Sequence, residues 1–455
     1  MSHPPLTPAF CASNGIILLG AEGKTINFGV VNINDAVLKQ RVKKTYQQYR
    51  CVFQEMEPEA FNLKLSLLYS ETEGDGISSA VRENRASVID RVADDAPAVN
   101  LLNSIFLDAV SRRASDIHIE SGPEEAAVRY RIDGILVTVK NISQERSAAV
   151  SARLKILSNL NVLENRRPQD GHIDIKTDTY SLDVRISILP TVWGESIVLR
   201  LLNRSDIPLD LDSLGFSAAH NGYLQGITEL RSGLVLVTGP TGSGKTTTLA
   251  AILKKMDIDS RKIISIEDPV EYRIPGITQI QVHEELELTF DTLLRRIFRQ
   301  DPDIIMVGEI RDMETAELAV RAAMTGHLVF ATLHTDNALE AVSRLQNIGI
   351  PGYMVASVLR AVIAQRLVRK ICPDCMGGGC GTCLKTGYFG RTVVAEFISV
   401  ETALSDMIAR GAAMEELRVH LKGKDQKTLF DDAEEKTARG VTTEPEIRRE
   451  LGARQ

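Results

Sequence analysis

The first 70 residues alternate short apolar runs with polar stretches and carry no chemical motif. Segment 70–76 consists of serine, threonine, acidic residues and glycine, which is typical of a linker. The pattern therefore predicts an N-terminal region with its linker over residues 1–90, separate from the part of the chain that follows.

From Ala96 onward the apolar positions become regular. A helix is expected from Pro97 to about Arg113, because apolar residues recur at helical spacing at Val99, Leu102, Phe106 and Ala109. Alternating segments then predict strands over 115–120, 126–132, 135–139, 173–175 and 180–188, with a helix over 147–160. We expect these elements to form a compact α+β domain over residues 91–205.

A second pattern begins after residues 203–230, which read as a connector that leads into a small helix. An apolar strand, a glycine-rich loop and a helix follow one another over 233–251, and further apolar strands are predicted over 263–266, 304–307 and 328–333. Strands that alternate with helices form doubly wound, mostly parallel sheets. An α/β fold is therefore expected over residues 206–371, completed by a strand and helices over 391–455.

The composition of the 455 residues is that of an ordinary globular protein, with 44% hydrophobic and 25% charged residues. The net charge of −7 disfavours a nucleic-acid partner, because binding a phosphate backbone usually requires a basic surface. The longest apolar runs, 16–19 and 234–237, are much shorter than the ~20 residues of a membrane span. The N-terminus lacks the charged-then-apolar order of a signal peptide, so a cytoplasmic chain is expected.

The glycine-rich segment 239–246 fits the pattern G-x-x-x-x-G-K-[ST] and lies between a predicted strand and a predicted helix. In such a loop, backbone N–H groups converge on phosphate oxygens at a helix N-terminus. Lys245 adds a positive charge at the β- and γ-phosphates, and the Thr246 hydroxyl can ligate Mg²⁺. The predicted nucleotide-binding residues are Gly239, Pro240, Thr241, Gly242, Ser243, Gly244, Lys245, Thr246 and Thr247.

Chemically active side chains follow several of the later strands. Glu309 comes after the strand over 304–307, and Gly308 stands where many phosphate-loop proteins have aspartate, so Glu309 is the better candidate for polarising water. Glu267 reaches the end of another strand, where ligands bind in open α/β sheets. His334, at the exit of a third strand, is a candidate γ-phosphate sensor. For either acid alone, a helix-capping or surface role is the alternative.

Four ordered boxes stand out along this part of the chain: the loop 239–246, the acidic segment 264–272, segment 299–312 and the histidine segment 325–335. Together they resemble the boxes of the secretion traffic ATPases. The resemblance continues backward through shorter segments at 114–120, 129–134, 167–171 and 190–195, and so covers about residues 96–395. Within the family, the chain looks most like the assembly ATPases of type II secretion and type IV pilus systems.

The resemblance implies a homohexameric ring that hydrolyses ATP with Mg²⁺ and drives the assembly of a pilus or pseudopilus. Each subunit would pair a PAS-like second N-terminal domain with a RecA-like ATPase domain and close on ATP between them. The implied partners are a platform protein of the cytoplasmic membrane and a membrane-associated recruitment protein that binds residues 1–90. The implied location is the cytoplasm, in peripheral association with the inner membrane.

In this family, arginines from the N-terminal domain and from the helix before the acidic strand reach the phosphates. The matching positions here are Arg185, Arg200, Arg295 and Arg299. Guanidinium groups stabilise charge on a transferring phosphoryl group, so the role is physically sound. The alternative is that these are surface or salt-bridge arginines. One departure is His172, because the family commonly has arginine after Gln-Asp-Gly.

Two C-x-x-C pairs, Cys372 with Cys375 and Cys380 with Cys383, indicate a tetrahedral Zn²⁺ site with four thiolates. Such a site has no open coordination position and would be structural. The family's assembly ATPases carry a similar tetracysteine module, which corresponds to residues 372–390, although their two pairs are commonly farther apart than here. An incomplete site is the alternative.

The sequence leaves three other functions open. A pilus retraction motor is disfavoured, because such motors usually lack both the tetracysteine module and a long N-terminal region. A nucleic-acid translocase is disfavoured by the negative charge and by the small number of aromatic residues, 12 Phe, 9 Tyr and 1 Trp. A nucleotide-dependent scaffold without turnover is excluded only if Glu309 is active. A secretion, pilus or conjugation system would each be compatible with these residues.

Overall fold

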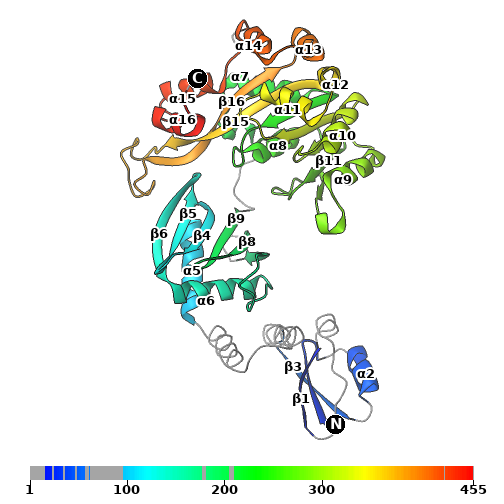
Figure 1. Cartoon of the computed structure of the whole chain (residues 1–455), viewed down its shortest axis with the longest axis vertical. Helices are drawn as coiled ribbons and strands as arrows, with labels where there is room; N and C mark the ends of the chain where they lie inside the picture. The colour runs from blue at the N-terminus through cyan, green and yellow to red at the C-terminus, as the bar shows by residue number, and fades with distance from the viewer. Residues whose placement is uncertain are drawn as a thin grey trace.

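The computed structural model describes residues 16–22, 25–33, 36–46, 49–56, 61, 96–176, 181–203, 210–424 and 426–453, which form three sheets with their helices (Figure 1). The predicted linker at 70–76 lies outside these residues. Among the described helices, none combines the length and the apolar character that a membrane span requires.

The first sheet belongs to the N-terminal region and has its own small core. Its strands are β1 (Ile16–Glu22), β2 (Thr25–Val30) and β3 (Arg50–Glu55), with helix α2 (Ala36–Thr45) between β2 and β3 in the chain. Phe28 of β2 packs with Leu38 and Val42 of α2 in this core. The short apolar runs of this region therefore include buried strands.

The second sheet has six antiparallel strands and forms the expected α+β domain. In spatial order they are β6 (Ile135–Ser143), β5 (Glu125–Ile132), β4 (Ala114–Ser121), β9 (Gly194–Asn203), β8 (Ser181–Thr191) and β7 (Gln169–Lys176). Helices α5 (Ala96–Ser111) and α6 (Gln144–Leu157) pack against the strands in one core. The arrangement confirms the α+β class expected for this part of the chain.

Two details of the α+β domain differ from the sequence prediction. Helix α6 begins three residues earlier than expected because the Ser143 side chain caps it by accepting from the Arg146 N–H. Strand β9 was not predicted, although its apolar residues Ile197, Leu199 and Leu201 alternate in the way that indicates a strand. Buried Lys155 joins the two elements, with Nζ 2.6 Å from Glu195 Oε1.

The third sheet has seven strands and confirms the doubly wound α/β fold. In spatial order they are β12 (Thr278–Gln281), β11 (Ile263–Glu267), β13 (Ile304–Val307), β14 (Leu328–Leu333), β10 (Gly233–Thr238), β15 (Leu359–Ile371) and β16 (Tyr388–Ser399). Only the β15–β16 pair within this sheet is antiparallel. Strands β12 and β15 were not predicted from the sequence.

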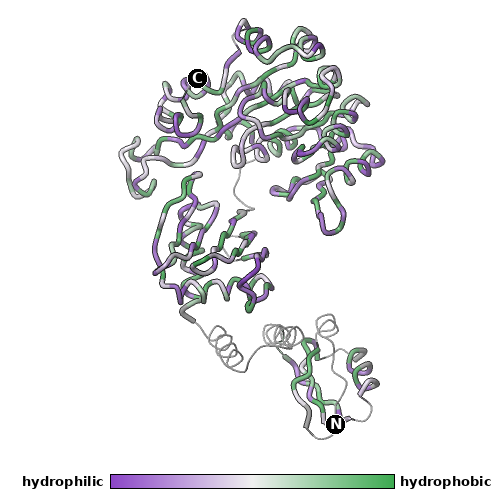
Figure 2. Tube along the Cα trace, viewed as in Figure 1, coloured by the Kyte–Doolittle hydropathy of each residue, from purple (hydrophilic) through white to green (hydrophobic). Residues whose placement is uncertain are grey.

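Helices cover both faces of the seven-stranded sheet. Leu234 and Leu236 of β10 face one core, and Val235 and Val237 face the other. The second core includes helices α7 (Ala218–Thr228) and α8 (Lys245–Lys254) and the short helix η1 (Leu211–Leu214). The first core includes α9 (Phe290–Ile297), α10 (Met313–Met324), α11 (Glu340–Ile348), α12 (Gly352–Val358), α13 (Thr402–Ala409), α14 (Met414–Lys422), α15 (Leu429–Ala438) and α16 (Glu444–Leu451). Hydrophobic stretches accordingly run through the interior of this part (Figure 2).

The β15–β16 hairpin projects beyond the rest of the sheet (Figure 1). Its strands have 13 and 12 residues, and the cysteine cluster lies between them. Near this end the hairpin contacts the α+β domain. The Gly390 N–H donates to Asp133 Oδ2 at 3.0 Å, and the Arg113 guanidinium lies 3.6 Å from the centre of the Phe389 ring.

Candidate functional site

The glycine-rich loop leaves the carboxyl end of β10 and leads into α8. Gly239, Gly242 and Gly244 all have positive φ angles, of 148°, 80° and 87°. At Gly239 a Cβ atom would also lie 2.4 Å from the Gln365 carbonyl oxygen, so the backbone there approaches β15 too closely for a side chain. The loop thus brings its backbone to the N-terminus of α8, where the helix dipole favours a phosphate.

Lys245 is the first residue of α8 and is buried. Its Nζ donates to the carbonyl oxygens of Gly239 and Pro240, at 2.7 and 3.1 Å. Burial lowers the pKa of Lys245 to about 8, against the opposite effect of the nearby Glu309 carboxylate. The ammonium group is therefore held inside the loop by two backbone carbonyls.

Glu309 lies beside the loop, just beyond β13. One of its oxygens, Oε1, is 3.2 Å from His334 Nε2, and the other accepts a hydrogen bond from Arg311 Nε at 2.9 Å. Burial and the positive charge of Lys245 lower the pKa of His334. Because β13, β14 and β10 are neighbours in the sheet, their carboxyl ends bring Glu309, His334 and Lys245 to one edge.

Glu267 occupies a different environment at the end of β11. Its carboxylate is buried and accepts from Ser265 Oγ at 2.6 Å and from Gln279 Nε2 at 2.9 Å. Burial raises the pKa of Glu267. These two hydrogen bonds connect it to β11 and β12, whereas Asp268, the next residue, lies 3.6 Å from Arg311.

A cleft of about 840 Å³ lies between the α+β domain and the acidic segment 268–273. Arg185 of β8 and Arg200 of β9 are paired across the two strands, and both line the cleft. Arg200 Nε is 3.3 Å from Asp116 Oδ1. Burial lowers the pKa of Arg185, and Asp183 and Glu271 oppose this effect. His172 also lines the cleft, with Nε2 2.5 Å from Asp183 Oδ1.

The other two predicted arginines lie elsewhere. Arg295 is on an exposed face of α9, 3.9 Å from Asp291, and Arg299 is exposed in the short helix η3 (Phe298–Gln300) that follows. Neither side chain lines the cleft. The structure thus brings two of the four arginines to the cleft and leaves two on the surface of this chain.

Three further residues at the loop were not identified from the sequence. Gln365 Nε2 donates to the Ser243 carbonyl at 2.8 Å, and Tyr272 Oη is 3.0 Å from Thr247 Oγ1. Arg366 donates to the Asp336 carboxylate at 2.9 Å, just beyond the histidine segment. Tyr272 ends the acidic segment 264–272 of the family resemblance, which is the signal that could have singled it out.

The cysteine cluster has the geometry of a metal site. All four Sγ atoms lie within 4.8 Å of one another, and the contacts between them are 3.7 to 3.9 Å. Tetrahedral thiolates at ~2.3 Å from Zn²⁺ would be about 3.8 Å apart. The N–H groups of Gly379 and Cys380 lie 3.1 Å from Cys375 Sγ and Cys383 Sγ and so support thiolate charge. The short spacing between the pairs is therefore compatible with a complete site.

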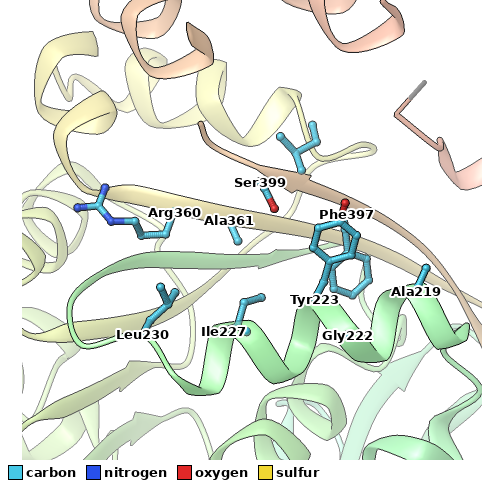
Figure 3. A pocket seen from close by; sticks show the side chains of 11 residues that line it. Ala219, Gly222, Tyr223, Ile227, Leu230, Arg360, Ala361, Phe397 and Ser399 are labelled. Carbon is cyan, nitrogen blue, oxygen red and sulfur yellow. The ribbon is translucent and has the colours of Figure 1, made fainter. Parts of the chain in front are cut away.

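A second hollow, of about 480 Å³, lies between α7 and the β15–β16 hairpin (Figure 3). It is mostly apolar, and Tyr223 stacks on Phe397 with ring centres 6.0 Å apart. Arg360 is its only lining residue with a charge. Its lining includes no residue of the glycine-rich loop.

Comparisons with known proteins show the family of this chain. Residues 91–449 match the family model described as "Type II/IV secretion system protein". The type II secretion system protein HxcR of Pseudomonas aeruginosa is 43% identical over 364 residues, which cover 78% of each chain. The type II secretion system ATPase E of Vibrio cholerae is 40% identical over 381 residues, which cover 78% of this chain and 76% of the relative.

Solved structures of ATPases share the fold. The pilus retraction motor PilT with bound ADP is 29% identical, with a TM-score of 0.56 over 76% of this chain and 95% of that chain. The ATPase DotB of Legionella pneumophila is 22% identical, with a TM-score of 0.62 over 77% of this chain and 94% of that chain, and shows the fold alone. With the phosphate-binding loop and the sequence match taken together, the chain belongs to the type II/IV secretion system protein family, as one of its ATPases.

Proposed function

We propose that this chain is the ATPase that drives assembly of a pilus or pseudopilus at the cytoplasmic membrane. The observation that carries the proposal is the meeting of Lys245, Glu309 and His334 at one edge of the sheet, in a chain whose relatives include secretion and pilus assembly ATPases. The type IV pilus assembly ATPase PilB of Myxococcus xanthus, for example, is 40% identical over 386 residues.

In the proposed site, the loop and Lys245 bind the phosphates of ATP, and the Thr246 hydroxyl would hold Mg²⁺. Magnesium would supply positive charge at the phosphate oxygens. Glu309 orients the attacking water, and the contact with Arg311 keeps its carboxylate in place. His334, which contacts the same carboxylate, reports on the γ-phosphate. Glu267 is a weaker candidate for the base because its buried carboxylate is bonded to residues of β11 and β12, whereas Glu309 contacts His334 beside the loop.

Arg185 and Arg200 are proposed to reach the phosphates when the two domains close. Their position in the cleft opposite the acidic segment supports this role, because their guanidinium groups now face carboxylates that a phosphate could replace. Arg295 and Arg299 are exposed, so their proposed role requires a closed state or a neighbouring subunit.

The wider assembly is proposed as a homohexameric ring in the cytoplasm, peripherally bound to the inner membrane. A platform protein of that membrane would receive the motion, and residues 1–90 would bind a membrane-associated recruitment protein. The separate core of the first sheet supports a recruitment domain, since it needs no contact with the ATPase part to bury its apolar side chains. The other proposed domains are the PAS-like domain over 91–205 and the RecA-like ATPase core over 206–371. The zinc module over 372–390 and the C-terminal strand and helices over 391–455 complete the chain.

A dilution experiment tests the ring. We expect ATP turnover per chain to rise steeply with protein concentration and to follow a six-subunit species measured by light scattering, because the closure of one subunit acts on its neighbour. Added Lys245→Ala subunits should lower activity more than in proportion to their number, whereas added Lys254→Ala subunits should not. Constant turnover per chain at concentrations where only monomer scatters would contradict the ring.

The same preparation separates the motor from its alternatives. The proposed motor predicts that vesicles with anionic lipid and the platform protein raise ATP turnover, and that DNA does not. Stimulation by DNA would favour the translocase.

An experiment in cells separates assembly from retraction. Loss of filaments in cells that carry Glu309→Gln would support assembly. An excess of filaments would favour the retraction motor, to which the similarity with PilT gives some weight.

The cysteine cluster is proposed to hold one structural Zn²⁺ per chain. Elemental analysis of protein purified without chelator should find about one zinc, and Cys375→Ser should lose it, since three thiolates hold the metal less tightly. Cys51→Ser is the matched control, because Cys51 lies on β3, outside the cluster. Metal loss should increase hydrogen exchange over 372–390 and leave the sheet intact. A zinc content near zero in folded wild-type protein would show that the cysteines are reduced thiols.

A further inference from the structure

Gln365 is a buried polar residue directly beneath the phosphate-binding loop. Its side chain is on β15, which pairs with β10, and Thr238 at the start of the loop is paired with Ala364. The residue is 1% exposed, and its Nε2 donates to the Ser243 carbonyl oxygen at 2.8 Å. One side-chain amide thus connects the strand to the middle of the loop.

This hydrogen bond fixes the orientation of a peptide group. In a trans peptide the C=O and the following N–H point in opposite directions. With the Ser243 carbonyl turned toward Gln365, the Gly244 N–H must point away from β15, at the N-terminus of α8. A phosphate at that helix end accepts from such N–H groups.

The orientation of the amide itself is determined by its partner. A flipped amide would place Oε1 against the Ser243 carbonyl oxygen, two acceptors facing each other, so the NH₂ group must be on the loop side. Among the described residues, neither Gln365 Oε1 nor Ser243 Oγ has a hydrogen-bond partner, although both atoms are buried. Buried polar groups are rarely left unpaired, and the Ser243 hydroxyl, which belongs to the loop, can donate to a phosphate oxygen.

The next residue of the strand anchors a second part of the site. Arg366 Nη2 donates to the backbone oxygen and to the carboxylate of Asp336, at 3.0 and 2.9 Å. Asp336 follows His334 by two residues. Two consecutive residues of β15 therefore hold the loop on one side and the histidine segment on the other.

From these contacts we propose that Gln365 is a positioning residue of the nucleotide site, which turns the Ser243–Gly244 peptide so that its N–H faces the phosphates. It acts through the loop and does not touch the nucleotide. The inference rests on the ATP binding proposed above, and it assigns to the amide a contribution to phosphate affinity and not to recognition of the base.

The test compares Gln365→Met with Gln365→Glu. Methionine keeps the length of the side chain and loses the donor, so the Kd values for ATP and pyrophosphate should rise by about tenfold. The affinity for adenosine, measured by its competition with ATP, should be unchanged, because adenosine has no phosphate. An unchanged adenosine affinity also verifies that the variant is folded. Glutamate places an acceptor against the Ser243 carbonyl, so its effect should exceed that of methionine. Gln225→Met, an exposed position on α7, is the control and should match wild type.

Three results would overturn the inference: Gln365→Met binding ATP as wild type does, equal losses of ATP and adenosine binding, or Gln365→Glu binding pyrophosphate better than Gln365→Met does. Each can occur while the wild-type protein hydrolyses ATP, so each leaves the proposed function standing. Wild-type protein that fails to bind ATP would instead overturn both.

Discussion

Replacing Glu309 by glutamine is expected to lower the kcat of ATP hydrolysis by at least ~100-fold, the loss typical of removing a general base. Glutamine has the same shape but cannot take a proton from water. The affinity for ATP should change little, because the proposed contacts to the phosphates come from Lys245 and the backbone of the loop. Phosphate release gives kcat, and equilibrium binding of ATP gives the affinity.

Glu317→Gln is the control for this experiment. Glu317 lies on α10, close in sequence to Glu309, and forms an ordinary surface ion pair with Arg321 at 2.6 Å. Its replacement should leave kcat at the wild-type value. A Glu309→Gln protein with wild-type kcat would show that another group acts on the water, and Glu267→Gln would be the next variant to measure.

Replacing Lys245 by alanine is expected to weaken ATP binding by roughly 10- to 100-fold, the range for losing a hydrogen bond from a charged donor. Hydrolysis should fall to background, since the same charge also stabilises the transferring phosphoryl group. Lys254→Ala, at the exposed end of the same helix, should bind ATP as wild type does. Equal affinities in the two variants would contradict the assignment of Lys245 to the phosphates.

The pH dependence of ATP binding is a second test of whether the charge of Lys245 contributes to the affinity. In the empty protein its pKa is about 8, so the side chain loses its charge as the pH rises through this value. A bound phosphate favours the charged form, so binding above pH 8 must take up a proton and the affinity must fall as pH rises. Lys254→Ala should keep this decline, and Lys245→Ala should lose it.

Part of the site could be predicted because its residues belong to short sequence motifs. The loop at 239–246 combines glycines with lysine and threonine at a fixed spacing, and the acid after β13 follows an apolar run. A parallel sheet brings the carboxyl ends of its strands to one edge whatever their order, which is why the sequence could place Glu309 and His334 at the same edge as the loop, while their catalytic roles stay predictions. The convergence of the cysteines likewise follows from their short spacing.

Other parts of the site depend on which strands are neighbours. Ser243 and Gln365 are 122 residues apart in the chain, and they meet because β15 pairs with β10. No local pattern indicates this pairing, and β15 itself was not predicted. The arginines show the same limit, since the resemblance suggested four of them and the fold brings only Arg185 and Arg200 to the cleft.

The amino-acid sequence by itself determined the class of the domains that follow residue 90, the glycine-rich loop, the acidic strand ends and the cysteine cluster, because apolar periodicity and motif spacing are properties of short segments. The tertiary structure decided the strand order, the support of the loop by Gln365 and the partners of Glu309. These are contacts between distant segments, and they form only when the buried faces of the strands and helices pack into common cores.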